Sequence, residues 1–113
     1  MADCIFCKII AGEIPSAKVY EDEDMLAFRD INPQAKVHVL VVPKSHFATL
    51  AEMDDMQAEL VKKCMKKIPS IAESLGLSDG YRLIVNQGEA AGQTVHHLHI
   101  HILGGQNMGE KML

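Results

Sequence analysis

The sequence lacks the features that mark several classes of protein. Lys and Arg number 11 against 15 Asp and Glu, and a net charge of −4 provides no general basic field for binding a polynucleotide. No apolar run approaches the ~20 residues that span a membrane, so we expect no membrane partner. The cysteines are few and odd in number, at three, which does not indicate the disulfide framework of a secreted protein.

Targeting and linker patterns are missing from the sequence as well. Asp3 stands where a signal peptide would carry basic residues, and Lys8 interrupts the apolar run that follows. We find no repeat, no low-complexity segment and no linker. The 113 residues therefore predict a single domain over 1–113, which we expect to be cytoplasmic.

The most distinctive stretch of the chain is "HHLHIHILGG", residues 96–105. Within it, His97, His99 and His101 alternate with large apolar residues, which is the period of a β-strand. As a strand, the segment would line one face with three imidazoles and turn Leu and Ile toward a core. Clustered imidazoles serve catalysis or bind a metal more often than they serve structure alone, and the run by itself leaves these three options open.

The remaining pattern predicts an α+β fold. We expect a short helix within 4–15, two strands joined by an acidic turn within 17–33, a strand over 37–46 cut by Pro43, a long helix over 54–77, and a strand over 80–86 before the histidine strand. Short connections between strands favour an antiparallel sheet with the helices packed beside it.

The long helix carries clear signals at its start and in its interior. Asp54 followed by Gln57 resembles a capping box, and apolar residues from Leu60 to Leu75 form one stripe that includes Cys64. Pro69 lies inside this pattern, and we expect it to kink or split the helix.

A glycine-rich loop, "QGEAAGQT" at 87–94, leads into the histidine strand. Its glycines would let backbone N–H groups approach an anion closely, and Gln93 and Thr94 add neutral donors. Beside three imidazoles, such a loop could hold a phosphate, although glycine-rich connections are also common as simple turns.

Cys4 and Cys7 form a C-x-x-C pair in the first helix. The pair could be half of a zinc site, a redox pair, or two small apolar residues on a short helix. A redox pair normally follows a strand in a βαβ unit, which is not predicted here. A closed tetrahedral zinc site would need two further ligands.

Together these segments carry a family resemblance. Residues 97–103, "HLHIHIL", resemble the histidine triad signature, and residues 4–46 and 80–105 are similar to the Hint branch of the histidine triad (HIT) superfamily. The resemblance implies a five-stranded antiparallel sheet that extends across a homodimer. It also implies a purine mononucleotide as ligand and cleavage at its α-phosphate, typically of a P–N bond in a nucleoside phosphoramidate or of an adenylate.

The resemblance also assigns roles to individual residues. His99 would be the nucleophile that forms a nucleotidyl-histidine, His101 would contact the phosphate, and His97 would orient the nucleophile in a relay that includes His38. Asp30 would bind the ribose hydroxyls. The phosphate-binding positions match Asn86, Gly92, Gln93 and Thr94. The apolar walls of the base pocket, which could equally be core, match Phe6, Ile9, Phe28, Ile31 and Leu40.

Some bacterial members that resemble this chain bind zinc with the same two cysteines and two histidines. The matching positions are His46 and His97, which would make a structural zinc site with Cys4 and Cys7. If His97 holds zinc, it cannot serve fully as a proton relay.

The implied chemistry requires a neutral imidazole as nucleophile, with a hydrogen bond to its other nitrogen to fix the tautomer. A backbone carbonyl or His97 could accept that bond from His99. If protonated, His101 would stabilise the transition state. A histidine with a pKa of about 6.5 could protonate a leaving amine. This scheme requires no cofactor for catalysis.

Two other functions fit the same residues. The H-x-H pattern with a third ligand could hold a catalytic zinc that activates water. Alternatively, the protein could be a nucleotide-binding module with little physiological turnover, because such a module needs the same pocket.

Overall fold

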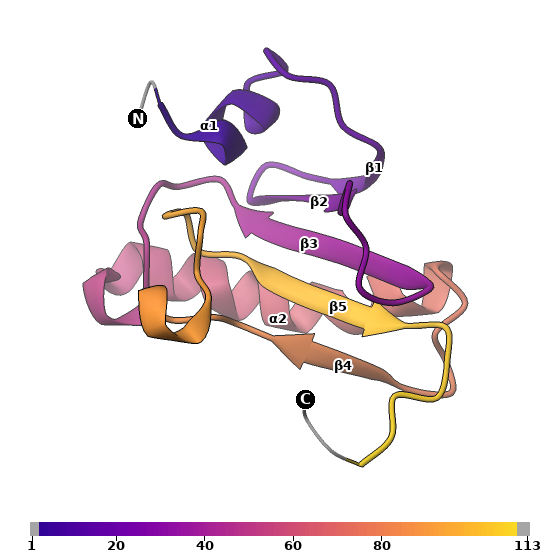
Figure 1. Cartoon of the computed structure of the whole chain (residues 1–113). Coiled ribbons are helices and arrows are strands. Elements are labelled where there is room, and N and C mark those ends of the chain that lie inside the picture. Colours follow the sequence, from indigo (N-terminus) through magenta and orange to yellow (C-terminus); the bar gives the residue numbers. More distant parts are fainter. Residues whose placement is uncertain (1–2, 111–113) are drawn as a thin grey trace.

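The computed structural model describes residues 3–110, so the first two and last three residues of the predicted domain lie outside the described part. Within it, the chain forms an α+β fold with one five-stranded antiparallel sheet, as the sequence predicted (Figure 1). The elements are α1 (Ile5–Ile10), β1 (Lys18–Glu21), β2 (Met25–Arg29), β3 (Val37–Pro43), η1 (Leu50–Glu52), α2 (Asp55–Ser74), β4 (Tyr81–Ile84), η2 (Glu89–Ala91) and β5 (Ile100–Gly104).

The strand order β1-β2-β3-β5-β4 places β5 between β3 and β4. Every neighbouring pair is antiparallel, and Leu40 of β3 lies opposite His101 of β5. This pairing brings residues from the first half of the chain beside the histidine segment near its end.

The two faces of the sheet bury different sets of side chains. Val39 and Val41 of β3 face α2, which runs behind the sheet in Figure 1, whereas Leu40 and Val42 belong to a second cluster with α1. Alternate residues of a strand point to opposite faces, which explains this division. His101 shares its face with Leu40, so the candidate site forms on the α1 side of the sheet.

Helix α2 begins as predicted but does not divide at Pro69. Asp54 and Gln57 form the reciprocal capping box, with N–H to side-chain oxygen distances of 2.8 and 3.0 Å. Of the two expected outcomes, a kink or a split, the split is wrong, because the helix continues through Pro69 to Ser74. Proline removes the N–H that would bond to the Met65 carbonyl, and both residues are exposed, so water can satisfy that carbonyl.

The predicted histidine strand begins three residues later than expected. β5 starts at Ile100, and the chain bends before it, where the Leu98 N–H donates to the Phe47 carbonyl at 2.7 Å instead of entering the sheet. The three histidines still gather on one side. The ring centroids of His99 and His101 lie 4.9 Å apart, and Phe6 contacts the rings of both His97 and His99.

In the part of the chain that the structure describes, no helix combines the length and apolar character needed to cross a membrane.

Candidate functional site

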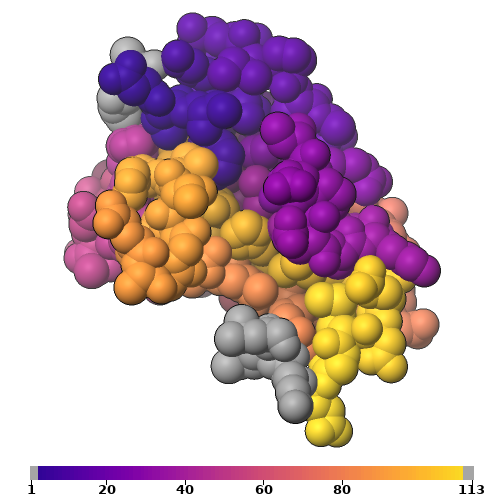
Figure 2. All heavy atoms as spheres, viewed as in Figure 1, coloured from indigo at the N-terminus to yellow at the C-terminus, as the bar shows by residue number. Residues whose placement is uncertain are grey.

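A cavity of about 370 Å³ opens on the α1 side of the sheet, between α1, β2, β3 and the segment that precedes β5. Figure 2 shows the indigo α1 segment close to the orange loop before β5 on the face in view. The residues that line the cavity are Ile5, Phe6, Ile9, Ile14, Pro15, Ser16, Phe28, Arg29, Asp30, Ile31, Leu40, Thr94, Val95, His99 and His101.

The tautomer of His99 follows from its backbone partner. Its Nδ1 lies 2.7 Å from the His97 carbonyl oxygen, which only accepts, so we assign the proton to Nδ1. Nε2 then carries a lone pair. Burial lowers the pKa of His99, which keeps the ring neutral at pH 7. The sequence left two candidates for this bond, and the structure identifies the His97 backbone carbonyl rather than its ring.

His38 and His101 form a second hydrogen-bonded pair with a defined direction. The Gln34 N–H donates to His38 Nδ1 at 3.0 Å, so the proton of His38 lies on Nε2. That N–H donates to His101 Nδ1 at 2.9 Å, which leaves the proton of His101 on Nε2. Among the described residues, this buried Nε2 has no hydrogen-bond partner. It is therefore a neutral donor available to a ligand in the cavity.

Asp30 lies beside this pair, with Oδ2 3.5 Å from His38 Nε2. Burial, followed by the charges of His99 and His38, lowers the pKa of His101 to about 4. Burial also lowers the pKa of His38, despite the opposing effect of Asp30. The role considered for His101 if it were protonated therefore does not apply at neutral pH, and the pKa values of His38, His99 and His101 all lie below the 6.5 considered for a proton donor.

The His97 ring points away from the His38–His101 pair. Its Nε2 lies 2.9 Å from the Pro43 carbonyl oxygen, so the proton is on Nε2 and Nδ1 carries the lone pair. Nδ1 faces the sulfur atoms of Cys4 and Cys7, at 3.5 and 3.6 Å. The contacts in the described residues thus place the His97 ring with the cysteines and its carbonyl with His99.

Cys4, Cys7, His46 and His97 form one cluster, hereafter the Cys/His cluster. One ligand atom from each lies within 4.8 Å of all the others, and Cys7 Sγ is 3.4 Å from His46 Nδ1. In a tetrahedral zinc site, bond lengths of about 2.3 Å to sulfur and 2.0 Å to nitrogen separate the sulfur and nitrogen ligands by about 3.6 Å. The three sulfur–nitrogen distances match this value closely, so the residues fit a tetrahedral metal ion.

The Cys/His cluster holds α1 at its first turn. Cys4 is the N-cap of α1, and its sulfur accepts a hydrogen bond from the Cys7 N–H at 3.4 Å. Burial, followed by the hydrogen bond and charge of Cys4, raises the pKa of the Cys7 thiol to about 11. A metal ion would have to displace the thiol protons, as is usual for thiolate ligands.

The loop before β5 is organised by Gln93. This side chain is buried, its Oε1 accepts from the Gly88 N–H at 2.8 Å, and its Nε2 donates to the carbonyls of Ala48 and Val95. These bonds occupy the amide group, which makes Gln93 a support of the loop in this structure rather than a free phosphate donor. Thr94 lines the cavity, whereas Asn86 and Gly92 do not.

Gly92 has a left-handed backbone, with a φ of 86°. A side chain would strain this conformation, which ends the η2 turn and directs Thr94 into its place beside the cavity.

The predicted base-pocket walls fall into two groups. Four are both core and cavity lining, namely Phe6, Ile9, Phe28 and Leu40. Ile31 is fully exposed although it lines the cavity, so burial in the core does not explain it.

Ser16 lines the cavity although no sequence pattern predicted it as part of the site. Its hydroxyl is buried without a hydrogen-bond partner among the described residues. Gly12 and Pro15 predicted only the end of the first helix. The path of the chain back across the cavity depends on packing that the local pattern does not encode.

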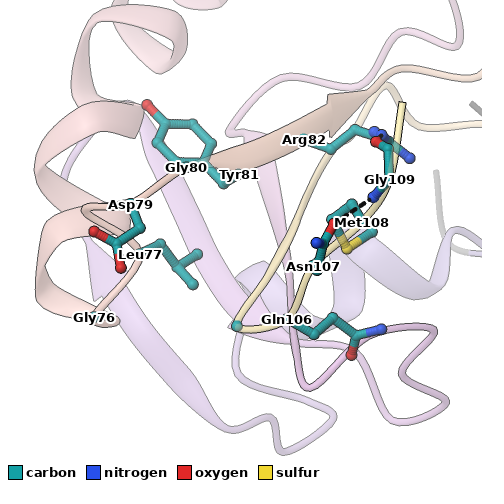
Figure 3. Close-up of a pocket in the computed structure, with 11 residues that line it drawn as sticks. Gly76, Leu77, Asp79, Gly80, Tyr81, Arg82, Gln106, Asn107, Met108 and Gly109 are labelled. Atoms are coloured by element: carbon teal, nitrogen blue, oxygen red, sulfur yellow. Dashed lines mark hydrogen bonds between the residues drawn. The ribbon is translucent and has the colours of Figure 1, made fainter. Parts of the chain in front are cut away.

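A larger cavity, of about 610 Å³, lies at the other end of the sheet between the turn after α2, β4 and the C-terminal segment (Figure 3). Arg82 reaches across it and donates to the Gly109 carbonyl at 2.7 Å. Among the described residues that line it, none is a histidine or a cysteine. The smaller cavity therefore holds the reactive groups.

Comparison with known proteins agrees with this geometry. The profile of the HIT domain matches residues 11–108. A HIT family hydrolase from Clostridium thermocellum is 51% identical, with a TM-score of 0.95 over 100% of this chain and 99% of that one. A 14 kDa zinc-binding protein from Zea mays is 46% identical over 92% of this chain and 83% of its own. A histidine triad nucleotide-binding protein from Candida albicans is 34% identical, with a TM-score of 0.82 over 98% of this chain and 87% of that one. The chain belongs to the HIT domain family.

Proposed function

We propose that this protein hydrolyses purine nucleoside phosphoramidates or adenylates at the α-phosphate through a nucleotidyl-histidine intermediate. One observation carries the proposal: at one cavity, a neutral His99 with a lone pair on Nε2 lies beside His101, whose Nε2–H has no partner within residues 3–110. A nucleophile adjacent to a neutral donor suits attack on a phosphoryl group. The names of the relatives from Clostridium thermocellum and Candida albicans support a hydrolase and a nucleotide ligand.

The cavity offers a distinct surface to each part of a nucleotide. Apolar walls from α1, β2 and β3, including Phe6, Phe28 and Leu40, suit the faces of a purine base. Ile31 would cover the base at the mouth. The Asp30 carboxylate, partly exposed at the rim, suits the two ribose hydroxyls as a hydrogen-bond acceptor.

The reaction proceeds in two displacements. His99 Nε2 attacks phosphorus, the P–N bond breaks with its electron pair going to nitrogen, and the amine leaves with one proton taken from solvent. Water then attacks phosphorus, the bond to His99 Nε2 breaks, and one proton returns to solvent. The His97 carbonyl holds the Nδ1 proton throughout and stabilises the positive charge that the imidazole gains.

Donors around the phosphate stabilise its developing charge. His101 Nε2–H acts as a neutral donor. The Gln34 N–H donates to His38 Nδ1, so the proton of His38 stays on Nε2, and a second proton on His101 would sit on Nδ1 and face this N–H. Thr94 adds a hydroxyl from the loop that Gln93 supports. Asn86 and Gly92 remain predicted phosphate contacts only, because neither residue lines the cavity. A phosphate that His101 contacts would gain a hydrogen bond of the strong, charge-assisted kind.

The Cys/His cluster would hold a structural zinc ion. The sulfur–nitrogen distances of 3.4 to 3.6 Å and the free lone pair on His97 Nδ1 fit tetrahedral zinc, and the Pro43 carbonyl fixes the ring as an outer partner. Zinc there would supply stability to α1 and no catalytic water. The zinc-binding relative from Zea mays supports the choice of metal.

The proposed oligomer is a homodimer in which the sheet continues across two subunits. β4 is an edge strand, and Leu83 is only partly buried there. Met65 on α2 is 45% exposed. An uncovered edge with apolar side chains favours pairing with a second copy.

A second candidate function rests on a specific cluster. Ligand atoms of Asp30, His38 and His101 lie within 4.8 Å of one another, as two histidines and a carboxylate would in a catalytic metal site. A zinc ion there would activate a water molecule, and this water would replace His99 as the nucleophile.

Intact-protein mass spectrometry after mixing with adenosine 5′-phosphoramidate tests the proposal, with and without EDTA. We expect a transient adduct of one AMP that maps to His99, and no adduct or turnover in His99→Ala, which still binds AMP. His96→Ala is the matched control, because this exposed histidine is outside the cavity lining. Turnover that EDTA abolishes without any adduct would favour the zinc hydrolase. Binding with neither adduct nor turnover would leave a nucleotide-binding module.

A further inference from the structure

We infer that a metal ion in the Cys/His cluster positions the nucleophile, with His97 and Phe6 as the two positioning residues that transmit its effect to His99. The inference rests on the proposed function, and it gives the metal an effect on catalysis without contact with substrate. Two independent contacts join the cluster to His99, one through the backbone and one through an aromatic ring.

The backbone contact passes through a single residue. His97 presents Nδ1 to the cysteines, while its own carbonyl accepts the Nδ1 proton of His99 at 2.7 Å. A metal bond at one end of the ring and the Pro43 carbonyl at the other would fix the ring of His97, and with it the adjacent backbone. The carbonyl that sets the reactive tautomer of His99 is therefore held in place by the cluster.

The aromatic contact passes through α1. Phe6 lies between the two cysteines in sequence and is only 6% exposed. Its ring meets those of His99 and Phe28 edge to face, with centroids 5.0 and 5.6 Å apart. Such contacts have a preferred geometry, so the placement of α1 influences the plane of the His99 ring.

Helix α1 needs this support because it is short. It has six residues, well below the roughly 12–15 at which an isolated helix becomes even marginally stable. In the absence of metal bonds, its cysteines could hold the histidines only through thiol hydrogen bonds, and a thiol is a weak donor. Metal–ligand bonds in the same arrangement would hold α1 far more firmly.

The effect should appear in kcat more than in KM. Phe28 and Leu40, which form walls of the base pocket, belong to β2 and β3 and do not depend on α1. Loosening α1 would disturb only the part of the base pocket that Phe6 and Ile9 form, so nucleotide binding would weaken in part, whereas the orientation of His99 depends on both contacts.

The experiment compares metal-free protein, protein with one equivalent of zinc, and the Cys4→Ser/Cys7→Ser double variant. We expect kcat for adenosine 5′-phosphoramidate to be about threefold to tenfold lower without zinc, as the loss of one aromatic or hydrogen-bond contact would produce, with a smaller change in KM. The double variant should have the same kcat as the metal-free protein, and added zinc should not change it. Cys64→Ala is the matched control and should respond to zinc as wild type does, because Cys64 is buried in the α2 core, away from the cluster.

Two further measurements keep the inference testable if the metal-free protein unfolds or has no activity. The first is Phe6→Leu loaded with zinc, which should keep one bound zinc and still lose kcat by a similar factor. The second is the ¹⁵N NMR spectrum of His99, which should lose the single Nδ1–H tautomer when zinc is removed.

The inference is overturned if zinc raises the melting temperature but leaves kcat, KM and the His99 spectrum unchanged. It is also overturned if zinc-loaded Phe6→Leu retains wild-type kcat. If no form of the protein hydrolyses the phosphoramidate, the proposed function fails and the His99 spectrum alone decides: a zinc-dependent tautomer supports positioning, and an invariant one refutes it.

Discussion

The direction of the His38–His101 hydrogen bond leads to a prediction about the phosphate donor. In wild type, the His38 Nε2–H donates to His101 Nδ1 at 2.9 Å, which keeps the proton of His101 on Nε2, toward the cavity. His38→Phe removes this donor while keeping a ring of similar size at a residue that is only 5% exposed. His101 can then place its proton on Nδ1, and Nε2 would present a lone pair to the phosphate.

The expected loss of activity in His38→Phe follows from His101 Nδ1, which loses its hydrogen-bond donor. A buried acceptor without a donor costs about 1–3 kcal/mol. At about 1.4 kcal/mol per factor of ten, this corresponds to a loss of about 5- to 140-fold in kcat/KM. His38→Gln should recover much of the loss, because the amide Nε2–H can occupy the position of the imidazole Nε2–H.

The assay is steady-state hydrolysis of adenosine 5′-phosphoramidate, with circular dichroism to verify the fold and ¹⁵N NMR to report the tautomer of His101. If His38→Phe is folded and within twofold of wild type, the hydrogen-bond pair does not set the donor. If His38→Gln is as slow as His38→Phe, the contribution of His38 to catalysis is not its hydrogen bond to His101 Nδ1.

Two other predictions concern stability and assembly. The pKa of His101 is about 4 in the folded protein and 6.5 in the unfolded chain, so the unfolded chain binds more protons between these pH values. The free energy of unfolding is therefore highest above about pH 6.5 and declines as the pH falls toward 4. After a discount for partial solvent exposure, His101 should contribute about 1–2 kcal/mol of this loss. When the pH is lowered from 7 to 4, the urea midpoint of His101→Gln should therefore fall less than that of wild type, and an equal fall would refute the prediction. Met65→Glu should shift the proposed dimer toward monomer in sedimentation, whereas Met56→Glu, in the first turn of α2 and 80% exposed, should not. A wild-type protein that sediments as a monomer at all concentrations would contradict the dimer.

Local patterns predicted the elements of this fold well and their ends less well. The alternation around His99 correctly predicted that three imidazoles gather on one side of the sheet, although only His101 lies within β5. It placed the start of the strand too early, since the bend before β5 depends on the Leu98 N–H bonding to the Phe47 carbonyl, a contact between distant segments. No local pattern contains that information.

Pro69 illustrates the opposite error. The local rule treats a proline inside a helix as a break, but the cost of one missing hydrogen bond is small where the freed carbonyl faces water. The buried stripe of α2, with Cys64, Ile68 and Ile71 against the sheet, provides continuous packing on both sides of the proline. Tertiary contacts therefore outweigh the local preference, and the sequence alone could not weigh the two.

The candidate site shows most clearly what residue types cannot convey. The sequence posed a conflict at His97, which could bind zinc or orient the nucleophile, and in the structure the two proposed tasks would use different atoms of this one residue. The ring nitrogen faces the cysteines and the carbonyl faces His99. In the same way, the tautomers of His38, His97 and His99 depend on the Gln34 N–H and on the carbonyls of Pro43 and His97. These backbone groups are present in every residue, so no motif could have revealed them. The reactive state of each imidazole is determined by the fold, and the histidine motif provides only the rings on which the fold acts.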